Sequence, residues 1–261
     1  MNSRKTAILL ALLVTFLWSS SWILIKFGLA DIPPLAFAGL RYAIAFIGLL
    51  LVGAFTGRLH RLRHLDRSDW IPLAAYGLIF ITLTQGAQFL ALSMLPAVSV
   101  SLVLSFTPLL VALLGWRLLN EAPTHRQLLG IGIFLGGIAL YFYPYNGLGQ
   151  SAPGLLVAGF GLLVNAFSAL LGRHLNQRHT LDAYSVTLIS MGFGSLTLLG
   201  ISLPFSGFPS LSPLNWGALL WLGLINSALA FTLWNLALRS LSALESNLIN
   251  NTMLIQIAIL A

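Results

Sequence analysis

The 261-residue chain is 58% hydrophobic and only 7% charged, and it contains no cysteine. Because soluble domains carry about a quarter charged residues, one aqueous core cannot hide this apolar surface, and we expect lipid to be the solvent. The formal charge of +7 lies in short loops between apolar runs, which argues against a nucleic-acid partner, and the lack of cysteine excludes disulfides and thiolate metal sites.

Apolar runs that are long enough to cross a bilayer as helices recur along the chain. The first run begins after Arg4 and Lys5 and at its start resembles a signal peptide, but it continues past the serines to Leu29, which favours a retained spanning helix. Gly, Pro and Ser residues mark the connections. The predicted spanning helices lie near residues 6–28, 34–56, 71–92, 97–116, 127–144, 153–173, 183–204, 215–238 and 244–261.

Lys and Arg residues gather in alternate loops of this arrangement. With the N-terminus inside, all of the 13 fall in inner segments except Lys26 and Arg41, and the outer loops near 93–96, 145–152 and 205–214 hold none. By the positive-inside rule, the sequence predicts a multi-pass protein of the cell inner membrane with a cytoplasmic N-terminus.

An internal repeat is visible at an offset of 146 residues. Residues 70–97 align without a gap to residues 216–243, and the matches include Trp70 with Trp216 and a shared Gly-Leu-Ile block. We therefore predict an all-α polytopic membrane protein with an inverted repeat of two five-helix bundles, at 6–144 and 153–261. Nine spanning helices are present in this prediction. Ala261 corresponds to Gly115, so we expect a truncated sequence that lacks the tenth helix, with a true nine-helix protein as the alternative.

The segment LLNEAPTHRQLLGIGIFLGGIALYF, residues 118–142, joins an acid-x-Pro loop to a Gly-rich apolar helix. It resembles the signature of the EamA-type transporters of the drug/metabolite transporter superfamily. The resemblance covers the whole chain and implies two EamA repeats, ten helices and export of small metabolites, amino acids or drugs by alternating access. The chain departs from the pattern at Leu254, where the repeat would place a second Pro108. Other matching residues are Trp18 with the serines after it, Arg41, Ala97, Ser101 and Pro108.

One face of the predicted 6–28 helix is polar and aromatic. Such a stripe should face protein or water rather than lipid, so we expect Trp18, Ser19 and Trp22 to line a solute cavity. The alternative is an interfacial aromatic belt, and for Lys26 we favour outward snorkelling. The stripe, within about 100° of the circumference, consists of Thr15, Trp18, Ser19, Trp22 and Lys26.

Arg41 lies about two turns into the predicted 34–56 helix from its outer end. A charge at that depth is costly and should be paired or face water. Two interpretations stay open. Arg41 either clamps an anion or carboxylate of the solute, or ties the structure to a backbone carbonyl or to Asp31.

The predicted 97–116 and 244–261 helices carry matching polar faces. Ser101, Ser105 and Pro108 share one face, and the 146-residue offset maps the two serines to Asn247 and Asn251. We predict that both faces line a central cavity; the alternative is polar packing between helices. The predicted 71–92 helix adds Thr82, Gln85 and Phe89, and the predicted 153–173 helix adds Gly161, Asn165, Ser168 and Gly172, a set that we interpret as a packing face.

Glu245 is a carboxylate inside a predicted spanning helix and is therefore a candidate for proton coupling. It lies in the first turn, where an acid also complements the helix dipole, and we favour that structural role. Glu121 is expected to cap a helix or to pair with an arginine. The five histidines lie in inner loops without metal-site spacing, and no P-loop motif appears, so we expect no metal, no cofactor and no ATP drive within this chain.

These features favour a secondary transporter whose partners are a small-molecule solute and the lipid bilayer. We leave open whether two copies form a homodimer. An integral-membrane enzyme is the first alternative, and it would need acid, base or metal groups clustered at one membrane face. A non-transporting scaffold or sensor is the second.

Overall fold

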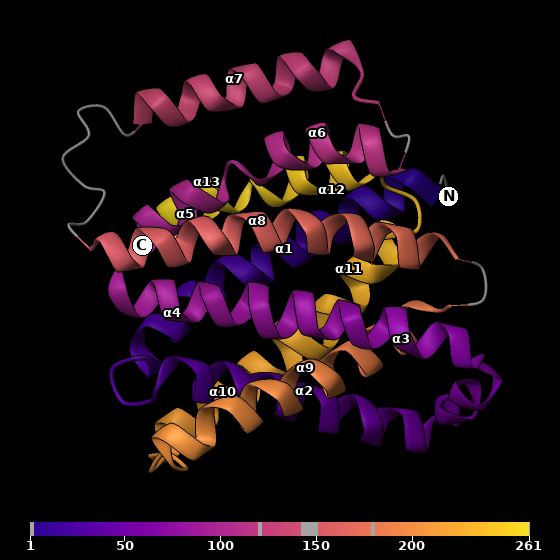
Figure 1. The fold of residues 1–261 in the computed structure, drawn as a ribbon, viewed down its shortest axis with the longest axis vertical. Helices are drawn as coiled ribbons and strands as arrows, with labels where there is room; N and C mark the ends of the chain where they lie inside the picture. Colours follow the sequence, from indigo (N-terminus) through magenta and orange to yellow (C-terminus); the bar gives the residue numbers. More distant parts are fainter. Residues whose placement is uncertain (1–2, 120–121, 142–150, 179–180, 261) are drawn as a thin grey trace.

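The structure is a computed structural model that describes residues 3–119, 122–141, 151–178 and 181–260 (Figure 1). Every regular element in these ranges is helical, which confirms the all-α prediction. The elements are α1 (Ser3–Gly28), α2 (Pro34–Phe55), the 3-10 helix η1 (Arg58–His64), α3 (Arg67–Tyr76), the π-helix η2 (Gly77–Gln85), α4 (Gly86–Met94), α5 (Ala97–Leu104), α6 (Thr107–Leu119), α7 (His125–Tyr141), α8 (Ala152–Gln177), α9 (Ala183–Ser206), α10 (Pro213–Gly223), the π-helix η3 (Leu224–Leu229), α11 (Ala230–Leu238), α12 (Ala243–Asn250) and α13 (Met253–Leu260).

Seven continuous helical stretches in the described ranges are long and apolar enough to cross a membrane, so the chain is a polytopic membrane protein. They match the predicted helices except those at 127–144 and 244–261. The first of these is the 17-residue α7, and the second is divided into α12 and α13. The count of nine spanning helices therefore stays a prediction.

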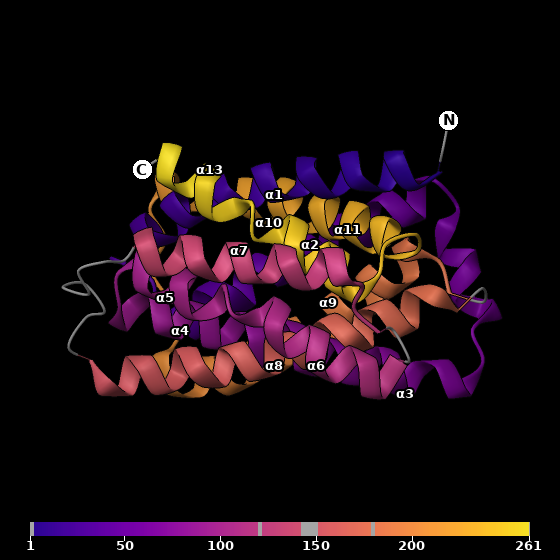
Figure 2. The same ribbon diagram turned by 90° about the horizontal axis from the view of Figure 1, so that it is seen from above.

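The two halves of the chain run in opposite directions. Figures 1 and 2 show α3 on the right and α4 on the left, whereas α10 lies on the left and α11 on the right. In Figure 1, α5 and α6 run from left to right, and α12 and α13 run from right to left. This arrangement is what an inverted repeat requires, because the second copy crosses the membrane in the reverse sense.

The duplication also appears in the local backbone conformation. The π-helix η2 begins at Gly77, and η3 begins directly after Gly223, the residue 146 positions further on. The breaks also match, because α5 is capped by Ser105 and α12 by Asn251, again 146 residues apart. Asn251 Nδ2 donates a hydrogen bond of 3.0 Å to the carbonyl of Ser105, so the pseudo-twofold axis that relates the halves passes between the breaks.

Proline explains only one of the two breaks. Pro108 has no N–H, so it cannot donate to the carbonyl of Leu104, and the Thr107 hydroxyl bonds that carbonyl instead at 2.6 Å. At the second break Leu254 donates its N–H to Asn251 O three residues back, at 3.1 Å. The second helix is thus interrupted even though Leu254 replaces the expected proline. At both breaks, polar side chains form hydrogen bonds with nearby backbone carbonyls, and these bonds compete with the helical hydrogen bonds.

Glycines let the halves approach closely at the centre. A Cβ on Gly77 would lie 2.5 Å from Ser190 O in α9, and one on Gly223 would lie 3.0 Å from Arg41 O in α2. The π-helix η2 of the first half therefore packs on α9 of the second half, and η3 of the second half packs on α2 of the first. The helices α2 and α9 also pack on each other. The core holds fully buried Phe37, Tyr42, Phe89, Leu188 and Met191.

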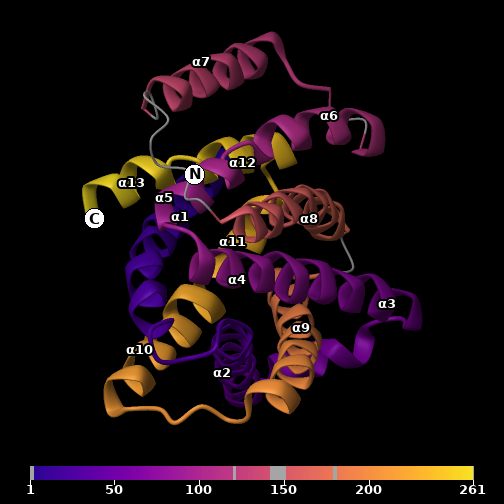
Figure 3. The same cartoon turned by 60° about the vertical axis from the view of Figure 1, so that its left-hand side comes forward.

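The helix α7 lies at the edge of the bundle beside α6 (Figures 1 and 3). Ile131 joins Val111 and Ala112 of α6 in an apolar cluster. Thr124 and Gln127 form a reciprocal cap at the start of α7, because Gln127 Oε1 accepts from Thr124 N and Thr124 Oγ1 accepts from Gln127 N. The predicted capping or pairing role of Glu121 falls outside the described residues.

Candidate functional site

A cavity lies among the helices that meet around the two breaks. The cavity has a volume of about 120 Å³, counted as the space that the centres of water molecules can occupy. All of the empty space between its walls, with the solvent at its mouth, amounts to about 1010 Å³. Space on this scale takes several waters or a small organic solute. Its walls come from both halves of the repeat: Trp18, Ser21, Trp22, Arg41, Tyr76, Phe80, Gln85, Gln88, Ser101, Leu104, Ser105, Asn165, Ser168, Ala169, Phe231, Trp234, Leu238, Ser246, Asn247, Asn250, Asn251, Met253, Leu254 and Ile257.

The structure brings most of the predicted site residues together at this cavity. Residues from α1, α2, η2, α5 and α12, together with the two cap residues, converge although they are far apart in sequence. The predicted residues that line it are Trp18, Trp22, Arg41, Gln85, Ser101, Ser105, Asn247 and Asn251.

Four predicted site residues lie elsewhere. Ser19 is fully buried, and its hydroxyl donates to Phe16 O at 2.7 Å. Phe89 is also fully buried and packs edge-on against Phe37 with ring centroids 5.3 Å apart. Pro108 is buried in the first turn of α6, where it acts on the backbone. Glu245 lies in the first turn of α12 and does not line the cavity.

Several lining residues were not among the predicted site residues. Gln88 follows Gln85 by one helical turn, so the stripe that predicted Gln85 could have found it. Asn165 and Ser168, which we interpreted as packing residues, line the cavity. Asn165 lines the cavity and also ties two helices together, because its Nδ2 donates to Thr107 Oγ1 at 3.2 Å. Phe231 and Trp234 gave no signal, since aromatic residues in a spanning helix are as easily explained by lipid contact.

An aromatic wall runs along one side of the cavity. The Trp18 ring lies 4.8 Å from Phe231 and 5.1 Å from Trp234, measured between centroids, and both contacts are tilted. Phe80 continues the wall at 5.1 Å from Phe231, and Tyr76 stacks on Phe80 at 5.2 Å. Tilted and edge-on contacts of this kind hold rings in fixed positions, so the wall offers a rigid apolar surface to a solute.

The π-helix η3 anchors the polar side of the site. A π turn shifts the hydrogen-bond register and frees backbone carbonyls for other donors. Here the carbonyl of Asn226 accepts from Trp18 Nε1 at 3.0 Å and from Arg41 Nη2 at 3.3 Å. The side chain of Asn226 donates to Leu17 O at 2.9 Å, which fixes α1 against η3. One residue of η3 therefore orients both a tryptophan and the arginine of the cavity wall.

Arg41 is 3% exposed and lines the cavity. Its Nε donates to Ser227 Oγ at 2.7 Å, and its guanidinium lies 5.3 Å from the Tyr42 ring centroid and 5.9 Å from that of Phe89. Of the two structural ties that the sequence suggested, the one to a backbone carbonyl is present, and Asp31 accepts from Asn215. These bonds leave the interpretation as an anion clamp open.

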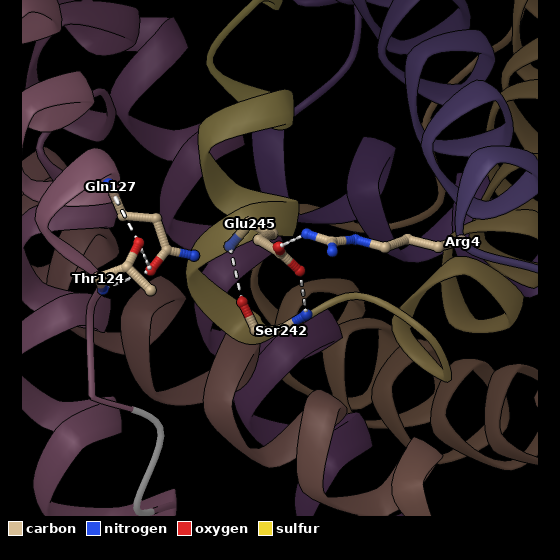
Figure 4. A network of polar contacts seen from close by, with 5 residues as sticks. All are labelled: Arg4, Thr124, Gln127, Ser242 and Glu245. Atoms are coloured by element: carbon tan, nitrogen blue, oxygen red, sulfur yellow. Dashed lines mark hydrogen bonds and ion pairs between the residues drawn. The ribbon is translucent and has the colours of Figure 1, made fainter.

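Polar ties join the two halves at both ends of the bundle. At the end with the N-terminus, Arg4 pairs with Glu245, which also forms a capping box with Ser242 (Figure 4), and Arg178 lies 3.5 Å from Asp69. At the opposite end, Asn215 Nδ2 donates to Asp31 Oδ2 at 3.0 Å, and within the first half Lys26 Nζ donates to Leu92 O at 2.9 Å. Asn215 follows Asp69 by 146 residues, so equivalent helix starts are tied at opposite ends.

The described residues include no group of three or more His, Cys, Asp or Glu side chains that could hold a metal ion. The described carboxylates also lie away from the cavity wall. Within the described part of the chain, the site therefore offers aromatic surface, amides, hydroxyls and one guanidinium.

Comparison with known proteins gives a consistent result. The sequence pattern of the EamA-like transporter family matches residues 5–143 and 152–261. An uncharacterized transporter of Bacillus subtilis, YvbV, is 33% identical over 216 residues, which cover 82% of this chain and 67% of that protein. A probable amino-acid metabolite efflux pump of Escherichia coli is 30% identical over 180 residues, or 67% of this chain and 54% of that protein.

A solved crystal structure shares the fold at a TM-score of 0.77 and 20% sequence identity, and the match covers 98% of this chain and 87% of that one. The family pattern spans both halves of the chain, and the relatives named here are described as transporters or an efflux pump. The chain is a membrane transporter that belongs to the EamA-like transporter family.

Proposed function

We propose that the chain is a secondary transporter that exports a small organic solute by alternating access around the cavity between its two halves. The observation that carries the proposal is the placement of the cavity at the pseudo-twofold axis, next to the Asn251–Ser105 hydrogen bond. In inverted-repeat transporters the solute site lies where the repeats meet near the middle of the membrane, often at discontinuous helices. Export is the direction that the name of the Escherichia coli relative suggests.

The polar ties at the two ends support an access change by rocking of one half against the other. The bonds that join the halves at the ends are few: Arg4 with Glu245 and Arg178 with Asp69 at one end, and Asn215 with Asp31 at the other. An exposed ion pair such as Arg4–Glu245 is worth about 0–1 kcal/mol, and a hydrogen bond to a charged group about 1.5–3 kcal/mol, so these ties can break without the unfolding of a helix. A chain that rocked would break ties at one end while it kept those at the other.

Solute flux from proteoliposomes tests the proposal. The purified protein is reconstituted, the vesicles are loaded with a labelled metabolite panel, and efflux is compared with that of empty vesicles. We expect Trp22→Ala and Asn251→Ala to lose most of the flux of any exported solute. The matched control is Trp221→Ala, because Trp221 is 51% exposed and does not line the cavity. Unchanged flux in both cavity variants, with flux present in the wild type, would refute this site.

Alternating access has a separate test that uses the absence of cysteine from the chain. A single Ser105→Cys substitution places a thiol on the cavity wall at the axis. We expect a membrane-impermeant maleimide to label this thiol from either side of the membrane, and a transported solute to slow both reactions. Labelling from one side only, under every solute condition, would contradict alternating access while leaving a one-sided binding site.

A further inference from the structure

The charge inside the cavity indicates what kind of solute the site binds. Resting on the proposed function, we infer that Arg41 binds the carboxylate of a small solute whose apolar or aromatic body lies along the wall of Trp18 and Phe231. The cavity thus selects carboxylate-bearing solutes over neutral or purely cationic ones.

Arg41 is a buried cation without a buried anion. The contacts that hold its guanidinium are neutral acceptors, Ser227 Oγ and Asn226 O, and none of the described carboxylates pairs with it. A guanidinium has five N–H donors, and these two bonds leave three for other acceptors. Neutral acceptors offset the burial of a charge only in part, whereas a carboxylate can take two parallel N–H donors of arginine at once.

Three of the described acids are engaged elsewhere. Asp31 accepts from Asn215 at the end of the bundle, Asp69 pairs with Arg178, and Glu245 pairs with Arg4. No described Asp, Glu, Lys or His side chain lines the cavity, so Arg41 sets the sign of its charge. An anionic group that enters gains an attractive partner in a space partly shielded from water, while a cation meets repulsion there.

The remaining walls fit the rest of such a solute. The Asn250 Oδ1 atom is buried and unpartnered, and Asn250 lines the cavity together with Gln85 and Gln88, whose amides have no hydrogen-bond partner among the described residues. These amides can accept from, or donate to, polar groups along the solute body. The aromatic wall beginning at Trp18 is rigid and offers an apolar surface to the body of such a solute.

Binding of matched ligand pairs tests the inference on the purified full chain. Each pair differs only in the carboxylate: phenylalanine with phenylalaninamide, and 3-phenylpropionate with 3-phenylpropionamide. Binding is followed through tryptophan fluorescence, because Trp18, Trp22 and Trp234 all line the cavity. We expect the wild type to favour the carboxylate member of each pair by about tenfold or more, the size that a charge-assisted hydrogen bond gives.

The variant Arg41→Gln should bring that ratio to about one, and Arg41→Lys should keep part of it. A ratio within one sample does not depend on the fraction of protein that folds. The matched control is Lys26→Gln, which removes a cation that lies outside the cavity, and it should keep the wild-type ratio. A wild-type ratio near one for both pairs, or a full preference that survives in Arg41→Gln, overturns the inference.

Flux of the same pairs from proteoliposomes separates this inference from the proposed function. Binding with carboxylate preference but without flux of these probes or of the metabolite panel supports the inference and refutes transport. Flux without carboxylate preference refutes the inference and supports transport. If the probes show no binding and no solute shows flux, both the inference and the proposed function are refuted.

Discussion

Gly77 is a position where one added methyl group should be costly, because the atoms that it would meet belong to the backbone. Its Cβ would lie 2.5 Å from Ser190 O and 3.0 Å from Ser190 Cα, and both atoms belong to the backbone of α9. Cβ contacts below 3.0 Å are essentially absent from real proteins, so in Gly77→Ala the seam between η2 and α9 must widen by at least about half an ångström. No flexible side chain can move aside to relieve this contact.

Overpacking of a well-packed interior costs about 1–3 kcal/mol. Replacing glycine by alanine in a helix returns about 0.5–1 kcal/mol, so the net decrease in the free energy of unfolding lies between about 0 and 2.5 kcal/mol. Because the contact is with backbone, we expect about 1–2 kcal/mol for Gly77→Ala. For a chain of this size the midpoint of thermal unfolding falls by about 2–4 °C per kcal/mol, which gives a decrease of roughly 2–8 °C. The assay is thermal unfolding in detergent micelles, followed by tryptophan fluorescence.

Gly200→Ala is the matched control, because Gly200 lies in α9, the helix on which Gly77 packs, and a Cβ there would meet nothing within 4 Å. We expect its unfolding midpoint to equal or slightly exceed that of the wild type. If Gly77→Ala unfolds at the same temperature as Gly200→Ala, the two halves do not approach as closely as described, and the reasoning fails.

Two further substitutions separate structural from functional roles. Glu245→Gln removes the charge that pairs with the 66%-exposed Arg4 side chain but keeps a capping acceptor, so we expect less than about 1 kcal/mol of destabilisation in the same thermal assay. Loss of pH-gradient-driven efflux with intact solute exchange would instead make Glu245 the coupling group. Trp18→Phe keeps the ring contacts but loses the N–H bond to Asn226 O, so it should cost about 0.5–1.5 kcal/mol, less than Trp18→Ala; equal unfolding midpoints for the two variants would contradict this.

The sequence predicted the fold well because its information lies in long apolar runs and in a repeat with a constant offset. Seven of the predicted helices appear as continuous stretches of spanning length. The π-helices and the second break were not predicted. The break at Asn251 has no proline, and the π turn after Gly223 coincides with close packing on α2, so it depends on a partner that is distant in sequence.

The candidate site could be predicted where polar residues interrupt an apolar helix, as Arg41, Ser105 and Asn251 do. It could not be predicted where the wall is itself apolar. Phe231 and Trp234 look the same in the sequence whether they face lipid or solute, and only the packing of α11 on α1 decides between these environments. Ser19 shares the polar stripe of Trp18 and Trp22 but is fully buried and bonds to its own helix, so a polar stripe alone does not say which of its residues reach the cavity.

The constant offset of 146 residues also identifies the counterpart of Arg41. The atoms nearest a Cβ on Gly77 belong to Ser190, and those nearest a Cβ on Gly223 belong to Ile44, again 146 residues apart, so the same offset puts Thr187 at the position of Arg41 in the other half. Two identical subunits would place a cation on each side of their axis and would treat both ends of a solute alike. Duplication within one chain allowed the sides to diverge, so under the proposed binding of a carboxylate at Arg41 a head-and-tail molecule would bind in a single orientation.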